Sequence, residues 1–136
     1  MTTRPRILII DDEADLAWML KLNLERTKLY EVEVETDPAR GVQAAQKFAP
    51  DLVLLDLILP QTSGGELAQQ LKTALAPAVL PVIFLTAALP RHESDGKPRT
   101  MAGYRVLSKP IDLRELLDCL ATELQPQRVP LTSGTR

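Results

Sequence analysis

The stretch Asp51-Leu-Val-Leu-Leu-Asp56-Leu-Ile-Leu-Pro60 decides the fold of this 136-residue chain. Its apolar residues do not alternate with polar ones, which is typical of a strand covered on both faces in a parallel sheet. Asp56 lies where such a strand leaves the core, at the carboxyl edge of the sheet. Ligands of open α/β sheets bind at that edge. We therefore expect the chemistry of the protein to centre on Asp56.

Strands and helices alternate around this stretch. The pattern predicts further strands over Ile7–Ile10, Glu31–Glu35, Pro81–Thr86 and Tyr104–Ser108, and helices over Glu13–Arg26, Pro38–Phe48, Ser63–Leu75 and Asp112–Leu124. Polar and apolar residues alternate strictly in Glu31–Glu35, which places that strand at a sheet edge. The repeat predicts an α/β fold: a three-layer, doubly wound, flavodoxin-like, five-stranded parallel sheet in the order 2-1-3-4-5.

The fourth helix of this repeat is poorly encoded. The stretch Leu89–Gly103 contains two prolines and two glycines, and its middle has no apolar periodicity. We expect the fourth helix to be short or disordered, in a mobile segment where His92 is a solvated loop residue. One domain is predicted over residues 1–124, followed by a flexible polar tail over 125–136.

Composition and charge exclude several classes of protein. The net charge is −2 and the basic residues are scattered, so we expect no nucleic-acid binding by this domain. A single cysteine, Cys119, excludes an intramolecular disulfide framework and favours a reducing compartment. The longest uncharged run, Ala74–Pro90, is too short and too rich in proline to span a membrane. A cytoplasmic location is expected.

Charged and polar residues come at four of the predicted strand ends. Asp11 and Asp12 end the first strand, Asp56 the third, Thr86 the fourth and Lys109 the fifth. One such residue alone would be explained as a helix cap or a turn residue, but four strand ends together are not. Clustered carboxylates repel one another unless a cation is bound, and Mg²⁺ prefers a few carboxylates plus water. A carboxylate beside Mg²⁺, a lysine and a hydroxyl suits an aspartyl-phosphate intermediate.

Four segments carry a resemblance to a known family: Ile-Leu-Ile-Ile-Asp11-Asp12-Glu13, Asp56-Leu-Ile-Leu-Pro60-Gln-Thr-Ser-Gly64, Phe-Leu-Thr86-Ala87 and Ser-Lys109-Pro110. Together they resemble the receiver domain of bacterial two-component response regulators, and the likeness extends from about Arg6 to Leu124. The resemblance implies that Asp56 is the phosphoacceptor of a sensor histidine kinase or a histidine phosphotransfer protein. Phosphorylation would then switch the binding of partners, and we expect a signalling switch and no enzyme.

The resemblance also implies a role for the other residues of these segments. Asp12, Asp56 and the backbone carbonyl of Ile58 would bind Mg²⁺ directly, and Asp11 through water. Lys109 would pair with the phosphoryl group and Thr86 would move toward it. The neighbouring Ala87 and Pro110 would belong to the same binding site, with Lys109–Pro110 a cis peptide, while Pro60 and Gly64 would shape the loop beside Asp56.

The chain departs from the family pattern at a few positions. The aromatic residue usual three positions before the lysine is replaced by Val106, and the nearest aromatic is Tyr104. The usual threonine–aromatic switch is therefore an open question, and we expect Tyr104 to have a packing role. Because Ile58 and Ala88 are apolar, we expect slow self-dephosphorylation.

Other readings stay open. Trp18 and Leu22, on an outer side of the first helix, are either ordinary surface residues or a docking site for the phosphodonor. The chain is alternatively a degenerate receiver that binds proteins without phosphorylation. A less favoured alternative is a phosphohydrolase with an aspartate nucleophile. Such hydrolases commonly carry a second aspartate where this chain has Ile58.

Overall fold

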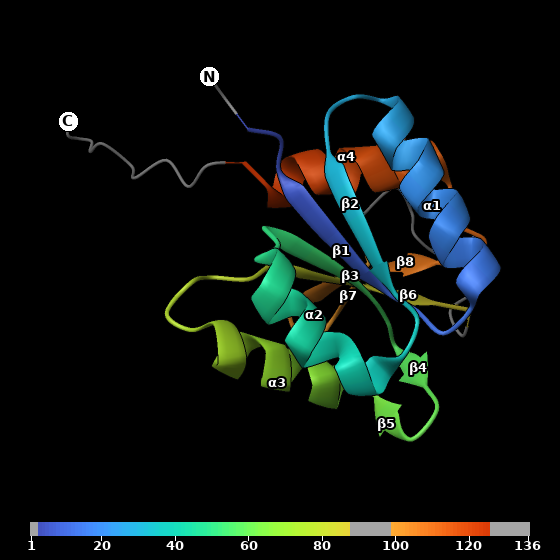
Figure 1. Cartoon of the computed structure of the whole chain (residues 1–136). Coiled ribbons are helices and arrows are strands. Elements are labelled where there is room, and N and C mark those ends of the chain that lie inside the picture. The colour runs from blue at the N-terminus through green and yellow to red at the C-terminus, as the bar shows by residue number, and fades with distance from the viewer. Residues whose placement is uncertain (1–2, 88–98, 126–136) are drawn as a thin grey trace.

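The computed structural model describes residues 3–87 and 99–125 (Figure 1). Strands and helices alternate along the chain as the sequence pattern predicts. Their bounds are β1 (Arg6–Ile10), α1 (Ala14–Arg26), β2 (Glu31–Glu35), the 3-10 helix η1 (Pro38–Arg40), α2 (Gly41–Phe48), β3 (Leu52–Asp56), β4 (Ile58–Leu59), β5 (Thr62–Ser63), α3 (Gly64–Leu75), β6 (Val82–Thr86), β7 (Thr100–Met101), β8 (Tyr104–Ser108) and α4 (Leu113–Glu123).

The main sheet has the strand order β2-β1-β3-β6-β8-β7. The first five strands in this order, β2, β1, β3, β6 and β8, pair in parallel. They correspond to the predicted strands 2-1-3-4-5, so the predicted order is confirmed. The prediction of a five-stranded sheet was wrong at one edge, where β7 pairs with β8 in antiparallel fashion. Ala102 and Gly103 connect these two strands with φ angles of 52° and 87°. Positive φ at both central residues is what a two-residue turn needs to match the twist of its strands.

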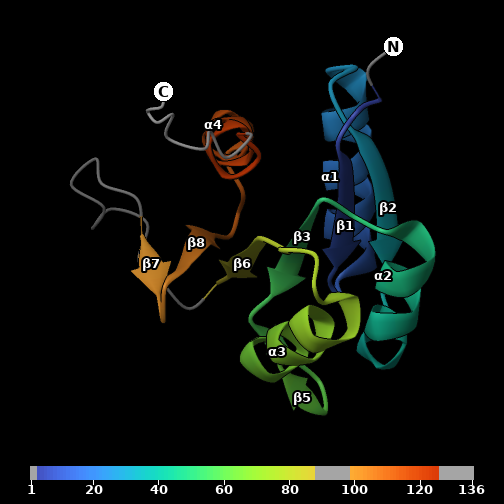
Figure 2. The same ribbon diagram turned by 90° about the vertical axis from the view of Figure 1, so that its left-hand side faces the viewer.

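Two layers of helices cover the sheet, with α1 and α4 on one face and α2 and α3 on the other (Figures 1 and 2). Successive strand residues point to opposite faces, so an unbroken apolar strand fills both layers. In β1, for example, Ile7 and Ile9 pack in the α1–α4 layer, whereas Leu8 and Ile10 pack in the α2–α3 layer. This arrangement buries the strands and leaves their carboxyl ends as the place for polar chemistry.

Side-chain hydrogen bonds fix where helices begin. The Ser63 hydroxyl accepts a hydrogen bond of 3.1 Å from the backbone N–H of Glu66 at the start of α3. At the start of α4, Asp112 accepts one of 2.9 Å from the backbone N–H of Arg114. These are the residues at which the two helices were predicted to begin, and their oxygens satisfy N–H groups that have no partner within the helix.

The first helix presents an apolar patch to solvent. α1 buries Ala17, Leu20 and Leu24. Trp18, Met19 and Leu22 are 53%, 54% and 55% exposed and form what we call the α1 apolar patch. Met19 directly precedes the buried Leu20 but does not share the buried face of the helix. Each helical residue turns by about 100°, which carries Met19 past the edge of the buried stripe.

Some predictions concern residues outside the described ranges. Residues 88–98, with His92, Ala88 and most of the segment expected to be mobile, are among them, and so is the tail from residue 126. The expectation of irregular chain up to Gly103 was wrong at Thr100–Met101, which form β7. Among the described residues, no helix is long and apolar enough to cross a bilayer.

Candidate functional site

The predicted site residues come from neighbouring strand ends of the sheet. Asp11 follows β1, Asp56 is the last residue of β3, and Thr86 is the last residue of β6. Lys109 follows β8, in which Ser108 pairs in register with Thr86. Because parallel strands end at the same edge, the register alone brings these four side chains to one edge of the sheet.

Lys109 joins the acidic residues into one cluster. Its Nζ lies 3.1 Å from Asp11 Oδ2 and 3.3 Å from Asp56 Oδ2, and it also contacts Glu13 Oε1. The Lys109 side chain is only 11% exposed, and the Asp11 side chain is fully buried. A buried ammonium needs such partners, because leaving it unpaired away from water is costly.

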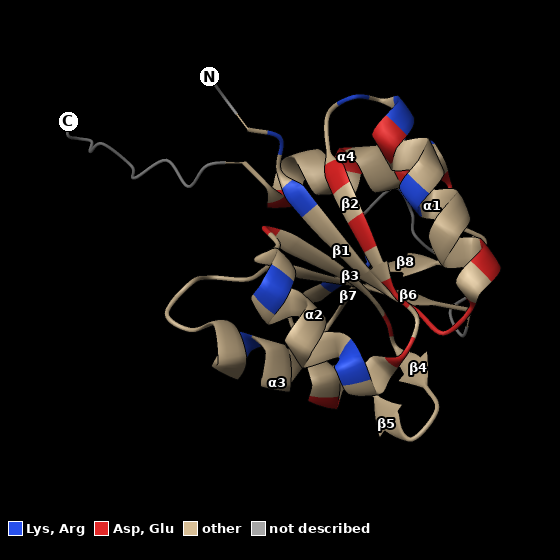
Figure 3. Ribbon diagram, in the orientation of Figure 1, with Lys and Arg blue, Asp and Glu red and all other residues tan. Residues whose placement is uncertain are grey.

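The carboxylates of Asp11, Asp12 and Asp56 could hold a metal ion. One oxygen from each lies within 4.8 Å of the others, and Figure 3 shows the acidic loop that follows β1. Backbone N–H groups orient two of them: Glu13 donates to Asp11 Oδ1 at 2.9 Å and Ile58 donates to Asp56 Oδ1 at 3.1 Å. The buried Asp11 Oδ2 has the Lys109 ammonium as its ion-pair partner. Three carboxylates gathered in this way fit a hard divalent cation such as Mg²⁺, which prefers oxygen ligands.

Burial shifts the pKa values of the two central groups. Burial raises the pKa of Asp56 to about 6, helped by the nearby Asp11 charge, although the Ile58 hydrogen bond and Lys109 oppose the rise. Burial by itself lowers the pKa of Lys109. The carboxylates of Glu13, Asp11 and Asp56 together raise this pKa by more than burial lowers it, so the pKa of Lys109 is above its usual range. Lys109 therefore stays positively charged at neutral pH, beside a carboxylate that ionises with difficulty.

The loop after Asp56 is held against the acceptor strand at Gly64. The backbone N–H of Gly64 donates a 2.8 Å hydrogen bond to the carbonyl of Leu57. A Cβ at Gly64 would lie 2.5 Å from the Asp56 carbonyl oxygen and 2.7 Å from Leu57 Cα. Only glycine allows this approach, because both neighbouring atoms belong to the backbone. The short β4–β5 hairpin lies between Leu57 and Gly64. It places Ile58 at the surface, where this residue is 64% exposed.

Of the threonine–aromatic pair in the resemblance, the threonine position holds Thr86 and the aromatic position holds Val106. Thr86 is buried, and Val106 is buried in the α2–α3 layer. The Tyr104 ring packs edge-to-face on Phe84, with centroids 5.1 Å apart, and Lys72 Nζ lies 4.4 Å from the centre of the Tyr104 ring. These contacts give Tyr104 a packing role against β6 and α3.

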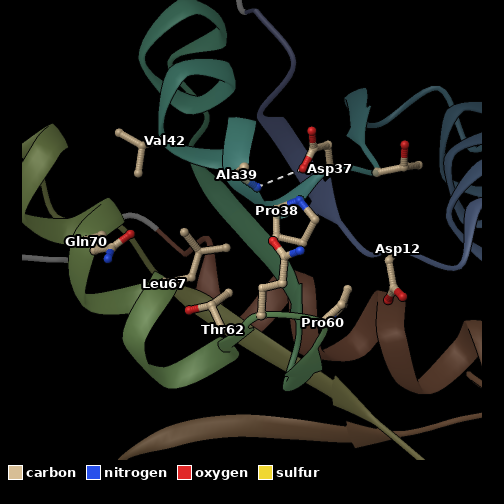
Figure 4. Close-up of a pocket in the computed structure, with 11 residues that line it drawn as sticks. Asp12, Asp37, Pro38, Ala39, Val42, Pro60, Thr62, Leu67 and Gln70 are labelled. Carbon is tan, nitrogen blue, oxygen red and sulfur yellow. Dashed lines mark hydrogen bonds between the residues drawn. The ribbon is translucent and has the colours of Figure 1, made fainter.

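A cavity of about 470 Å³ reaches the Asp12 side of the cluster (Figure 4). Pro38, Pro60 and Leu67 give it an apolar lining, while Asp12 and Asp37 add carboxylates. It lies between the start of α2, the β4–β5 hairpin and α3. Open space therefore adjoins the exposed edge of the acidic cluster.

The structure brings Asp11, Asp12, Asp56 and Lys109 together, and it adds one residue that the sequence analysis did not assign to the site. Glu13 was predicted as the first residue of a helix and closes one of the segments that carry the resemblance, without a role of its own. Among the described residues its side chain makes no capping hydrogen bond and contacts Lys109 instead. The Lys109–Pro110 bond is cis, as the resemblance implies, and Ala87 is the last described residue before the gap. A signal for Glu13 existed, since it directly follows two clustered acids.

A model of the family described as "Response regulator receiver domain" matches residues 7–121. The phosphate regulon transcriptional regulatory protein PhoB of Pseudomonas aeruginosa is 39% identical over 125 residues, covering 88% of this chain and 51% of PhoB. The DNA-binding dual master transcriptional regulator RpaA of Synechocystis is 35% identical over 113 residues, covering 83% of this chain and 46% of RpaA. The chain thus spans about half the length of these curated relatives.

Two solved structures have the same fold. The receiver domain of the hybrid histidine kinase CckA superposes with a TM-score of 0.69 at 27% identity, covering 88% of this chain and 99% of that domain. A CheY-like receiver domain protein from Methanospirillum hungatei has a TM-score of 0.71 at 25% identity, covering 90% of this chain and 94% of that one. The flavodoxin-like class predicted from the sequence is confirmed.

Proposed function

Because this chain belongs to the response regulator receiver domain family, we propose that it is a phosphoacceptor of a two-component or phosphorelay system. In this proposal Asp56 accepts a phosphoryl group from a sensor histidine kinase or a histidine phosphotransfer protein, in a Mg²⁺-dependent reaction. The phosphorylated domain then binds its partners with a different affinity. The cytoplasmic location expected from the sequence stays a prediction.

The observation that carries the proposal is the contact of one ammonium, Lys109 Nζ, with the buried carboxylates of Asp56 and Asp11. In the transfer, an Asp56 oxygen attacks phosphorus while the bond between phosphorus and the donor histidine nitrogen breaks. The imidazole leaves with the electron pair of that bond. Lys109 neutralises the charge of the phosphoryl oxygens, and Thr86, at the end of the adjoining strand, donates a hydrogen bond to one of them.

Asp11, Asp12 and Asp56 are the residues that would hold Mg²⁺, together with the backbone carbonyl of Ile58. The ion supplies positive charge to the phosphoryl oxygens. Burial raises the pKa of the Asp56 carboxyl to about 6, and positive charge beside it favours the ionised, nucleophilic form. The chain's own part is to orient the acids, through the backbone N–H groups of Glu13 and Ile58.

The test is incubation of the purified chain with acetyl phosphate and Mg²⁺, followed by intact-mass measurement and peptide mapping. A lasting gain of one phosphoryl group at Asp56, absent from Asp56→Asn and from samples with EDTA, is expected. Continuous phosphate release without mass gain would indicate a phosphohydrolase. If the protein shows neither mass gain nor phosphate release, it is a degenerate receiver that binds proteins without phosphorylation. The packing role of Tyr104 favours this alternative.

The α1 apolar patch supports the partner class. Trp18, Met19 and Leu22 present large side chains to solvent on one helix, and such exposed apolar groups commonly mark an interface. We propose that this patch docks the helix bundle of the phosphodonor. The DNA binding named for RpaA is a property of that protein, of which this chain covers 46%. From the net charge of −2 and the scattered basic residues, we expect no nucleic-acid binding by this domain.

A further inference from the structure

Glu13 takes part in the site from an unexpected position. It directly precedes the first residue of α1, where an acidic side chain would ordinarily cap the helix. In the described part of the chain its carboxylate caps nothing and contacts Lys109 Nζ, 96 residues away in sequence. The Glu13 side chain is 60% exposed, whereas the side chains of Asp11 and Asp56 are 0% and 7% exposed.

The ammonium group of Lys109 is enclosed by carboxylates, and it donates hydrogen bonds to Glu13 and Asp56. It has three N–H donors, and three carboxylates surround it, those of Asp11, Glu13 and Asp56. A phosphoryl group on Asp56 would need one of these donors. Phosphorylation therefore has to displace one of the present partners.

Glu13 is the partner that is easiest to displace. Asp11 and Asp56 belong to the set of carboxylates that could share a metal ion, and Glu13 does not. Asp11 is also buried, so losing the lysine would leave its charge without compensation. Glu13 can turn to solvent at little cost, because its carboxylate is already largely exposed.

We propose that Glu13 is a positioning residue: it holds Lys109 in the unphosphorylated protein and is released when the phosphoryl group takes its place. This inference rests on the proposed function of Asp56. The ion pair stabilises only the unphosphorylated state and so opposes phosphorylation. Its release frees a negative charge immediately before α1, the helix that carries the α1 apolar patch. Phosphorylation thereby changes the charge that a partner meets at this helix, by a route that does not use Tyr104.

The test compares the wild type with Glu13→Gln, Glu13→Asp and the control Asp15→Asn, an exposed acid in the first turn of α1. Binding of beryllium fluoride with Mg²⁺, a phosphoryl mimic, is measured by calorimetry for each protein. The Glu13→Gln variant removes the negative charge. The Glu13→Asp variant keeps the charge on a shorter side chain, which we expect not to reach Lys109. Both are expected to bind beryllium fluoride about three- to tenfold more tightly than the wild type, the range for a charged, partly exposed hydrogen bond. Asp15→Asn should bind like the wild type.

The outcomes separate this inference from the function on which it rests. If Glu13→Gln binds beryllium fluoride more tightly and Glu13→Asp binds it like the wild type, Glu13 merely repels the phosphoryl group. That result would overturn the inference. Unchanged or weaker binding by both Glu13 variants would also overturn it. Wild-type protein that binds no beryllium fluoride and accepts no phosphoryl group would instead overturn the proposed function, and the inference with it.

Discussion

Asp56→Asn is expected to make the metal-free protein more stable at neutral pH, although it removes the central residue of the site. The Asp56 side chain is 7% exposed. Burial raises its pKa from an ordinary value of 3.8 to about 6, against the opposing effects of the Ile58 hydrogen bond and Lys109. The folded protein therefore holds the proton of Asp56 more tightly than the unfolded chain does.

The sign and size of the effect follow from this difference. The contribution of protonated Asp56 to stability is complete below pH 3.8, the unfolded pKa, and is lost as the pH rises through about 6. Since each pKa unit corresponds to about 1.4 kcal/mol, ionised Asp56 lowers the free energy of unfolding by about 3 kcal/mol at pH 7.5. Asparagine has nearly the same shape and carries no charge, so the variant avoids this loss.

Urea unfolding followed by circular dichroism, in EDTA at several pH values from 4.5 to about 8, measures the difference. The advantage of Asp56→Asn should be about 3 kcal/mol at the top of the range and should shrink steadily as the pH falls. Saturating Mg²⁺ should reduce it, because the ion stabilises the ionised cluster of the wild type only. Asp118→Asn, at an exposed position of α4, should show no such trend. If Asp56→Asn is no more stable than the wild type at high pH without metal, the argument from burial is refuted.

Three further predictions concern the loop, the phosphorylated state and the partner. Gly64→Ala should lower the free energy of unfolding by about 1–3 kcal/mol in urea titrations, because its Cβ would meet the backbone of Asp56 and Leu57; an unchanged midpoint would contradict this. The phosphorylated protein should lose its phosphoryl group slowly, since Ile58 is apolar and exposed beside the acceptor, and a half-life of seconds by mass spectrometry would count against it. Trp18→Ala should leave phosphorylation by acetyl phosphate unchanged and impair transfer from the protein phosphodonor, whereas equal loss of both would show damage to the fold.

Local patterns in the sequence were sufficient for the parallel strands and their carboxyl-edge residues. Apolar runs such as Leu52–Leu55 need cover on both faces, and an alternating run such as Glu31–Glu35 needs an edge. Capping residues likewise act within one turn, so Ser63 and Asp112 marked helix starts correctly. The edge strand β7 was missed because the Ala102–Gly103 turn lacks the asparagine or aspartate that usually announces such a hairpin.

The sequence by itself therefore determined the layers, the order of the parallel strands and the edge at which Asp11, Asp56, Thr86 and Lys109 meet, because periodicity and strand ends are local properties. Only the tertiary structure decided how these groups pair. That Lys109 contacts Asp11, Asp56 and Glu13 at once depends on distances between segments remote in sequence. No local pattern encodes such distances, because the packing of helices on the sheet sets them.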